Sequence, residues 1–301
     1  MTLSVLIPTY NYNCTRLVGD LSRQCDVLQA RGRIDDYEII VADDGSTIRQ
    51  ALDDNRAIAD MPHARYIERG KNSGRAAMRN FLVSQSRGDY LLMLDQDGHV
   101  VSDTFVETFV DATVEHDVVC GRMIQSSSEP NAHYRLRYRY ERRYEQRMTT
   151  ERLNADPESP FRSFCFIIKR EVALRVPMDK SFRGYGYEDV YYGMQLRRLA
   201  GGFHHIDNRL QNFDLEPNPV YVEKTEEAMH TLYYHRHELR GGVRMLSTVE
   251  KIRRMRLMPL TRLAGMILLK PLRLNLCSDR PVVGLFNIYK FLYYTNIAND
   301  E

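Results

Sequence analysis

Two aspartates directly follow an apolar run in the first third of the chain. Residues 91–98 read LLMLDQDG, so one residue separates Asp95 from Asp97, and Gly98 follows. Strand side chains alternate between faces, so the two carboxylates point the same way if the extended geometry persists. A solvated loop explains such a pair without any function. A divalent cation between the carboxylates also explains it, because the ion offsets the repulsion between the two negative charges.

A second acidic pair follows two glycines. Residues 183–189 read RGYGYED, and Gly184 and Gly186 permit a bend that most side chains resist. Glu188 and Asp189 lie near the start of a predicted helix that ends at residues 201–202. Negative charge in a first helical turn is stabilised by the helix dipole, which is the structural explanation of this pair.

Composition limits the class of protein. A chain of 301 residues is long enough for one large α/β domain with additions, or for two small domains. The net charge is only +2, so no overall positive field indicates a nucleic-acid partner, and we expect none. The five cysteines are odd in number and include no C-x-x-C pair. This pattern argues against a disulfide scaffold or a zinc site and favours a reducing compartment.

The chain shows no pattern of export or of membrane insertion. Its N-terminal stretch, MTLSVLIPTYN, has neither a basic segment nor a small-residue cleavage site, so we expect no signal peptide. The longest apolar run, Leu263 to Leu269, is far shorter than the roughly 20 residues that span a bilayer. We therefore expect a cytoplasmic protein, with the inner face of the cell membrane as a second place where it acts.

The first half of the chain alternates strand and helix patterns. Apolar runs predict strands at residues 3–8, 37–42, 65–68, 89–94 and 117–124. Helical periodicity predicts helices at residues 14–30, 46–58, 75–86 and 104–115. This alternation predicts an α/β fold with a Rossmann-like, mostly parallel sheet flanked by helices. Residues 164–169 and 202–207 are further predicted strands, and His204 and His205 in the latter are interpreted as structural.

Three polar clusters follow predicted strands. Residues 9–11 (TYN) follow the first strand, residues 43–45 (DDG) follow the second, and residues 95–97 (DQD) follow the fourth. In a parallel sheet the carboxyl ends of the strands lie along one edge, where ligands bind. Together the clusters suit a ribose, a base or a metal–phosphate group.

Residues 134–147 (YRLRYRYERRYEQR) hold six arginines and four tyrosines. A solvated helix in which Glu141 and Glu145 pair with these arginines is one interpretation. Binding of an anionic or sugar-containing substrate is the other, because guanidinium groups grip phosphates and aromatic faces stack on sugars or bases.

The C-terminal part of the chain is basic and apolar. Residues 223–240 predict a helix that begins acidic and ends basic. Residues 251–278 then contain seven lysines and arginines and no acidic residue. Basic residues beside Leu, Met and Ile suit a helix at an anionic interface, so peripheral membrane contact through residues 250–278 is one expectation. A helical subdomain that packs on the catalytic core, or on a second copy in a homodimer, is the other.

Five motifs in register resemble those of family 2 glycosyltransferases of the GT-A fold. They are SVLIPTYN (4–11), EIIVADDGS (38–46), KNSGRAAMRN (71–80), LLMLDQDG (91–98) and RGYGYED (183–189). The last is similar to the G-x-G-x-E-D stretch of inverting, chondroitin-polymerase-like and galactosyltransferase-like members. The resemblance covers about residues 1–240, which implies a nucleotide-binding half at 1–125 and an acceptor-side half at 126–240. Residues 241–301 would form a helical C-terminal extension.

The resemblance also implies roles for individual residues. Asp44 is expected to bind the base, usually uracil, and Asp95 to face the ribose. Asp97, with Asp95, is expected to hold Mn²⁺ or Mg²⁺ through the D-x-D motif, and Asn212 stands where relatives often have a metal-binding histidine. The residues expected around the nucleotide sugar are Pro8, Thr9, Tyr10, Asn11, Asp44, Asn72, Gly74, Arg79, Asp95 and Gln96.

The implied reaction is inverting, metal-dependent hexosyl transfer. Asp189 matches the catalytic base and Glu188 its companion. The donor would be a UDP-sugar and the acceptor a glycan or lipid-linked glycan in surface polysaccharide synthesis. Attack of an acceptor hydroxyl on the anomeric carbon requires a proton acceptor, and a hard cation neutralises the departing diphosphate.

Two functions other than glycosyl transfer fit parts of the sequence. A nucleotidyltransferase also uses a nucleotide, a metal and an α/β sheet, but the chain lacks a phosphate-gripping, glycine-rich lysine motif near its start. A non-enzymatic protein that binds nucleic acid or a membrane surface through residues 134–147 and the basic tail is the second alternative.

Overall fold

The computed structural model describes residues 1–199, 201–212 and 214–298, in two compact units. The first, called here the sheet unit, comprises Met1–Ile124, Thr149–Arg183 and Tyr192–Phe213. The second, the helical unit, comprises Gln125–Met148, Gly184–Tyr191 and Asp214–Glu301. The predicted boundary at residue 240 does not coincide with this division, and residues 299–301 of the predicted extension lie outside the described residues.

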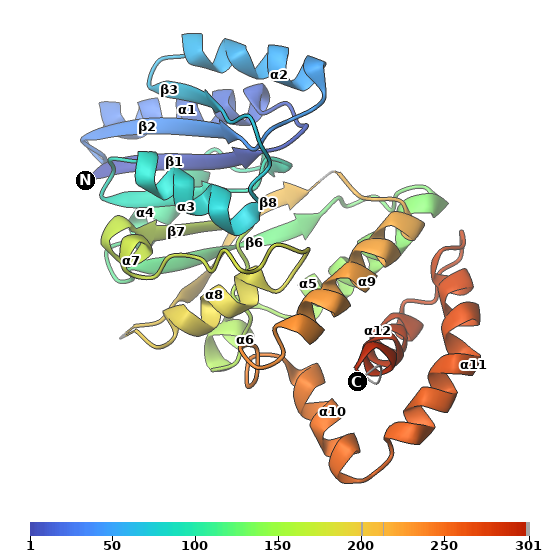
Figure 1. Cartoon of the computed structure of the whole chain (residues 1–301). Coiled ribbons are helices and arrows are strands. Elements are labelled where there is room, and N and C mark those ends of the chain that lie inside the picture. The colour runs from blue at the N-terminus through green and yellow to red at the C-terminus, as the bar shows by residue number, and fades with distance from the viewer. Residues whose placement is uncertain (200, 213, 299–301) are drawn as a thin grey trace. The chain divides into compact units, whose positions relative to one another are not determined.

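An eight-stranded sheet in the order β3-β2-β1-β4-β7-β6-β8-β5 forms the framework (Figure 1). The strands are β1 Thr2–Thr9, β2 Asp36–Asp43, β3 Ala64–Glu68, β4 Tyr90–Leu94, β5 Gly98–Val100, β6 Val118–Gln125, β7 Cys165–Lys169 and β8 His204–Asn212. The pairs β1–β2, β1–β4 and β2–β3 are parallel, which confirms the predicted α/β fold. Strand β7 is antiparallel to both of its neighbours, β4 and β6, so the fifth predicted strand, now β6, runs in the same direction as β4 but pairs with an antiparallel strand.

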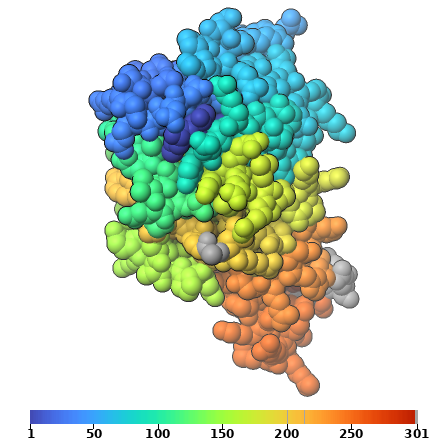
Figure 2. All heavy atoms as spheres, turned by 90° about the vertical axis from the view of Figure 1, so that its left-hand side faces the viewer, coloured from blue at the N-terminus to red at the C-terminus, as the bar shows by residue number. Residues whose placement is uncertain are grey.

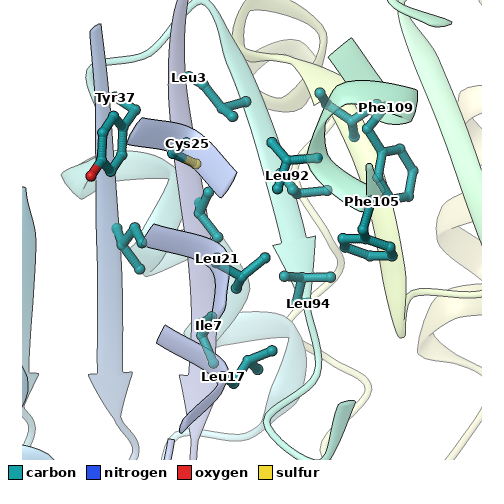
Figure 3. Close-up of a cluster of buried hydrophobic side chains, with 14 of the residues drawn as sticks. Leu3, Ile7, Leu17, Leu21, Cys25, Tyr37, Leu92, Leu94, Phe105 and Phe109 are labelled. Carbon is teal, nitrogen blue, oxygen red and sulfur yellow. The ribbon is translucent and has the colours of Figure 1, made fainter. Parts of the chain in front are cut away.

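Helices cover both faces of the sheet, because its strands are apolar on both sides. Leu3 and Ile7 of β1 point toward α1 (Thr15–Ala30), where Leu21 packs on them, and α4 (Phe105–Ala112) covers the same face (Figure 3). Leu6 points to the opposite face, which is covered by α3 (Arg75–Gln85) and α7 (Arg170–Arg175). This two-layered core holds the carboxyl ends of β1, β2 and β4 in fixed register.

The remaining helices of the sheet unit are short. They are α2 (Arg49–Arg56), the 3-10 helix η1 (Ala57–Asp60) and α6 (Thr150–Ala155). Helix α8 (Glu188–Leu196) begins in the helical unit and ends in the sheet unit. Its carboxyl-terminal part, with Leu196, is buried with the residues under α3.

The helical unit has its own apolar core. Its elements are η2 (Ala132–Tyr134), α5 (Arg135–Arg147), α9 (Asn218–Tyr234), α10 (Arg244–Arg254), α11 (Met258–Leu276) and α12 (Gly284–Ile297). Helix α12 lies between α9 and α11 (Figure 1) and buries Phe286 and Tyr289 against Leu276 and Tyr221. The helix predicted at residues 223–240 begins earlier, where Pro219 is suited to its first turn, and it ends at Tyr234.

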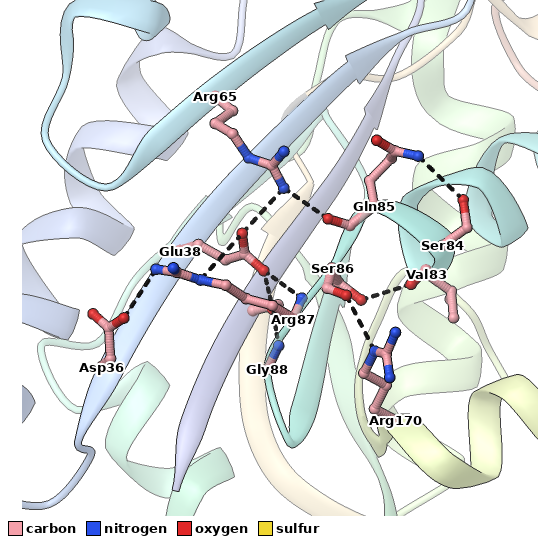
Figure 4. Close-up of polar contacts among 11 residues, drawn as sticks. Asp36, Glu38, Arg65, Val83, Ser84, Gln85, Ser86, Arg87, Gly88 and Arg170 are labelled. Atoms are coloured by element: carbon pink, nitrogen blue, oxygen red, sulfur yellow. Dashed lines mark hydrogen bonds and ion pairs between the residues drawn. The ribbon is translucent and has the colours of Figure 1, made fainter.

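A buried carboxylate ties three strands together near their amino ends. Glu38 of β2, only 4% exposed, accepts hydrogen bonds from the Ser4 hydroxyl at 2.6 Å and the Arg87 backbone N–H at 2.7 Å (Figure 4). Arg65 of β3 donates to its second oxygen at 3.1 Å. A buried charge is stable only when it is paired and hydrogen-bonded, so the sequence must supply these donors together.

Replacement of Glu38 by alanine should therefore destabilise the sheet unit by about 2–4 kcal/mol, because buried donors lose their acceptor. The matched control is Glu68→Ala, which removes an exposed carboxylate that Arg56 contacts at 2.7 Å on the neighbouring strand β3. Urea unfolding followed by circular dichroism should show a large shift of the midpoint for the first variant and little change for the second. Equal midpoints would contradict the structural role of Glu38.

Candidate functional site

The D-x-D residues form a turn and not an extension of the strand. Strand β4 ends at Leu94, and the Gly98 N–H donates to the Asp95 carbonyl at 3.2 Å. The extended geometry on which the alternation of the two carboxylates depended does not persist beyond Leu94, so strand alternation does not apply to them. Each carboxylate has a donor of its own: Arg79 lies 2.6 Å from Asp95, and the Asn212 amide nitrogen lies 3.3 Å from Asp97.

Arg79 is the buried anchor of this turn. Arg79 is only 4% exposed, and one terminal nitrogen of its guanidinium group donates to Asp95. Among the described residues its other terminal nitrogen has no hydrogen-bond partner. Because burial of an unpaired cation is costly, the ion pair fixes the position of Asp95 relative to helix α3.

Gln96 joins the turn to the end of strand β1. The Tyr10 N–H donates to its side-chain oxygen at 2.6 Å, and its side-chain nitrogen donates to the Tyr10 carbonyl at 3.2 Å. The amide thus pairs with both polar groups of one backbone residue. Both residues were predicted to surround the nucleotide, and the structure brings them into contact with each other.

Asn11 links the loop after β1 to the loop after β2. Its backbone has a positive φ of 54°, a conformation that asparagine adopts more readily than most residues. Its side-chain oxygen accepts from the N–H groups of Thr47 at 2.7 Å and Ile48 at 2.9 Å, and its own N–H donates to Ser46 at 2.6 Å. Thr9, also predicted, is buried and donates to the Tyr12 carbonyl at 3.2 Å.

Asp44 organises the loop before α3. Its carboxylate accepts from the Ser73 N–H at 2.9 Å, the Ser73 hydroxyl at 2.7 Å and the Gly74 N–H at 3.0 Å. Asn72 accepts from the same Gly74 N–H at 3.1 Å. The residue expected to bind the base therefore also fixes the loop that carries two other predicted site residues.

Two serines of this network were missed by sequence reasoning. Ser73 binds Asp44, and Ser46 donates both its N–H and its hydroxyl to Asp43. A local signal existed for Ser46, because aspartate followed three residues later by serine is a common turn pattern. No local signal existed for Ser73, whose acceptor lies 29 residues away.

The oxygen ligands at the turn fit a hard cation. Among the described residues no three or more His, Cys, Asp or Glu side chains gather as a metal cage. Mg²⁺ is commonly held by one or two carboxylates together with substrate phosphates and water, which suits Asp97 with Asp95. Asn212 faces Gly98 across the β5–β8 ladder and brings an amide group to Asp97.

The glycine that follows the D-x-D residues lies close to a side chain of strand β8. A Cβ atom at Gly98 would lie 2.4 Å from a methyl group of Leu210 on strand β8. A side chain at this position would therefore require Leu210 to move.

The predicted catalytic pair belongs to the helical unit. Glu188, buried, and Asp189 form the first turn of α8, where the Asp189 carboxylate accepts the Val190 N–H at 2.8 Å. The preceding loop is fixed on α9: the Tyr185 N–H donates to Glu227 at 2.8 Å. Tyr187 has a positive φ of 68°, which is uncommon for a bulky residue and makes this turn a constrained one. The catalytic role of Asp189 stays a prediction.

The arginine-rich segment is largely satisfied within the helical unit. Three arginines of α5 form ion pairs with acidic residues: Arg137 with Glu216, Arg139 with Glu129 and Arg142 with Glu145. The Glu216 pKa is lowered by the adjacent Arg137 and Lys224 despite the opposing effect of burial. These contacts favour the structural interpretation of residues 134–147 over that of a substrate-binding surface.

The two histidines of β8 lie among structural contacts, as expected. His205 is buried, and burial lowers its pKa to about 4, so that the ring is neutral near pH 7. His204 lies 3.1 Å from the Asn154 side chain. Neither residue contributes to the network at the carboxyl ends of β1, β2 and β4.

Comparison with protein families matches residues 4–176 to the model of glycosyl transferase family 2. The chain belongs to this family. The match includes four of the five motifs and the loops after β1, β2 and β4, while residues 183–189 and Asn212 lie beyond it.

Two curated relatives match parts of the chain. An uncharacterised glycosyltransferase of Haemophilus influenzae is 31% identical over 101 residues, which is 34% of this chain and 38% of the relative. A poly(ribitol-phosphate) beta-glucosyltransferase of Bacillus spizizenii is 29% identical over 127 residues, 41% of this chain and 19% of the relative. The chain thus matches well under half the length of either protein.

Solved structures share the fold. Residues 1–349 of S. aureus TarS, in complex with UDP-GlcNAc, match 100% of this chain and 92% of that one with a TM-score of 0.53 at 15% identity. Glucosyl-3-phosphoglycerate synthase from Mycobacterium tuberculosis, with Mn²⁺, UDP and glucosyl-3-phosphoglycerate, matches 77% of this chain and 79% of that one with a TM-score of 0.52 at 19% identity.

A glycine substitution tests how tightly the loops approach each other. Gly45 has a φ of +79°, and a Cβ there would lie 2.8 Å from backbone atoms of Lys71 and Asn72. Gly32 has a similar φ of +68° with no atom within 4 Å, and is the matched control. Gly32→Ala should cost about 1 kcal/mol of strain and Gly45→Ala about 2 kcal/mol or more, because the backbone before α3 must also move.

Urea unfolding of the two variants measures this difference. Midpoint shifts of equal size for Gly32→Ala and Gly45→Ala would show that the backbone of residues 71–72 moves at little cost. That result would contradict a rigid loop network.

Proposed function

We propose that the protein transfers a sugar from a UDP-sugar to a glycan or lipid-linked glycan, with inversion at the anomeric carbon, in surface polysaccharide synthesis. The observation that carries the proposal is the linked set of loops at the carboxyl ends of β1, β2 and β4, in a family 2 chain. Ligands of such sheets bind at this edge. Structural neighbours with this fold were crystallised with UDP or UDP-GlcNAc, which supports uridine as the base.

The donor would occupy the loop network. Asp44 and the loop of Asn72 and Gly74 would take the base, and Asp95, held by Arg79, would take the ribose. Pro8, Thr9, Tyr10, Asn11 and Gln96 would line the same pocket. Because these residues are already hydrogen-bonded to one another, little conformational entropy is lost on binding.

Asp97, with Asp95 and the Asn212 amide, would hold Mn²⁺ or Mg²⁺ beside the diphosphate. The ion would supply Lewis-acid stabilisation of the negative charge on the leaving group. The crystallisation of a structural neighbour with Mn²⁺ and of the same enzyme with Mg²⁺ supports either metal. The carboxylates that hold the ion are preorganised by Arg79 and by the turn that ends at Gly98.

Asp189 would accept the proton of the acceptor hydroxyl as that hydroxyl attacks the anomeric carbon. The carbon–oxygen bond to the diphosphate breaks in the same step, so no covalent enzyme intermediate is needed. Glu188, in the same helical turn, would orient the acceptor. The hydrogen bond from the Tyr185 N–H to Glu227 fixes the loop before α8, which supports Asp189 as the base, because a base must be held in a fixed direction.

A polymeric acceptor in the cytoplasm completes the proposal. The name of the B. spizizenii relative, which transfers glucose to poly(ribitol-phosphate), supports a cell-surface polymer as the acceptor class. Five free cysteines, four of them buried, support a reducing compartment such as the cytoplasm.

Donor binding is tested by thermal shift with UDP in the presence and absence of Mn²⁺. Saturation at about 100 times the dissociation constant adds about 2.7 kcal/mol to the stability of the folded state. Asp97→Asn should retain the melting temperature of the free protein and lose the metal-dependent part of the shift. Asp103→Asn, an exposed aspartate six residues further along, is the control and should behave as wild type. An unchanged metal-dependent shift in Asp97→Asn would contradict the metal assignment.

The base is tested by the release of UDP from a panel of UDP-sugars with Mn²⁺. Asp189→Asn should lower the rate about 10² to 10⁴-fold, because an amide cannot accept the proton, while UDP still binds. Glu171→Gln is the control, since Glu171 is an exposed carboxylate in the first turn of α7. Normal turnover by the Asp189 variant would remove Asp189 from the mechanism and leave the donor assignment intact.

A further inference from the structure

Helix α11 has two apolar faces on opposite sides. Gly265, Leu269, Leu272 and Leu276 recur at the spacing of one helix face and lie against α12 and its core. The contact is close, because a Cβ at Gly265 would lie 1.9 Å from the Asn296 side chain. This face accounts fully for the packing of α11 within the helical unit.

The opposite face is apolar as well, and it is exposed. With 3.6 residues per turn, Leu263, Ile267 and Leu274 lie on the side away from Gly265. Their exposed fractions are 54%, 62% and 66%, and the adjacent Met266 is 80% exposed. A helix that packs on one side only normally carries polar residues on the other, so this pattern indicates a second apolar partner.

Cations without acidic partners among the described residues precede this face in the chain and occur within it. Arg253, Arg254 and Arg256 precede α11, Lys270 lies within its exposed stripe, and no acidic residue occurs between Glu250 and Asp279. These four cations are in no ion pair with another described residue. The orange side chains around residue 250 lie on the surface toward the viewer in Figure 2.

We propose that the exposed face of α11, with the basic end of α10, docks on an anionic lipid surface. Leucine, isoleucine and methionine side chains would enter the boundary between headgroups and acyl chains, and the guanidinium and ammonium groups would meet lipid phosphates. Lys270 can extend its charged end from the apolar stripe to the headgroups. Among the described residues no helix is long and apolar enough to cross a bilayer, so the contact would be peripheral.

Charge favours lipid over a second copy of the chain. A symmetric dimer through this face would place the same patch on both partners. The arginines before α11 and Lys270 would then meet their own copies, and like charges at an interface are repulsive. An anionic surface complements the cations and covers the apolar side chains at the same time.

The test is co-sedimentation of the full chain with vesicles. One set is phosphatidylcholine alone, and the other contains about one-third phosphatidylglycerol to supply negative charge. The protein should bind the anionic vesicles, bind the neutral ones at least about tenfold more weakly, and dissociate as salt rises. Binding to neither set, or equal binding to both, overturns the proposal.

Two pairs of variants locate the surface. Arg253→Gln with Arg254→Gln should weaken binding to anionic vesicles about tenfold or more, and Met266→Gln with Ile267→Gln should do the same. The charge control is Arg16→Gln with Arg49→Gln, whose side chains in the sheet unit are 78% and 91% exposed. The apolar control is Val114→Gln, at a residue that is 87% exposed. Both controls should bind as wild type.

Outcomes of the variants are decisive in either direction. Full binding by the α10 and α11 variants, or equal weakening by the controls, places the contact elsewhere and overturns the proposal. Concentration-dependent dimerisation by analytical ultracentrifugation that Met266→Gln with Ile267→Gln abolishes, without vesicle binding by wild type, would show that the face binds a second copy. Circular dichroism of each variant confirms that the helical unit remains folded.

Discussion

The ion pair between Arg79 and Asp95 is the constraint on which the candidate site depends. A guanidinium group on the buried side of α3 cannot remain without an anion, and the residue that follows strand β4 supplies it. Strand β4 ends at Leu94, and the chain turns directly after it. The ion pair between Arg79 and Asp95 thus helps to position Asp97, two residues further along the same turn.

The other loops are held by each other and not by the strands alone. Gln96 pairs with the backbone of Tyr10, Asn11 accepts the N–H groups that open the loop after β2, and Asp44 takes those of the loop before α3. Polar side chains at this edge thus hold the loops together by hydrogen bonds within the protein. Glycines at 45 and 98 make this possible, because a side chain at either would collide with the neighbouring segment.

Much of this arrangement could be predicted from the sequence. The apolar runs before residues 9, 43 and 95 are strands, and their carboxyl ends carry the polar loops. The insertion of the antiparallel strand β7 between β4 and β6 could not be predicted, because it depends on contacts between segments distant in the chain. The ion pair between Asp95 and the buried Arg79, 16 residues earlier, could not be predicted, because it too joins separate elements.

The boundaries of the helical unit could not be predicted from the sequence either. Residues 125–148, 184–191 and 214–301 form it from three separate stretches, so no change of composition along the chain marks its boundary. Six arginines in one segment suggested a substrate surface, yet the structure pairs several with glutamates from elsewhere, including Glu129 and Glu216. The exposed face of α11 differs, since the cations there have no such partners among the described residues.

Hydrogen–deuterium exchange of the full chain with UDP and Mn²⁺ tests the central claim most directly. If the linked loops form the donor site, amides at residues 9–12, 43–48, 71–75 and 95–98 should gain protection together, and UDP without metal should protect residues 95–98 less. Protection confined to other segments, or none at these loops at saturating ligand, would contradict a donor site at the carboxyl ends of β1, β2 and β4.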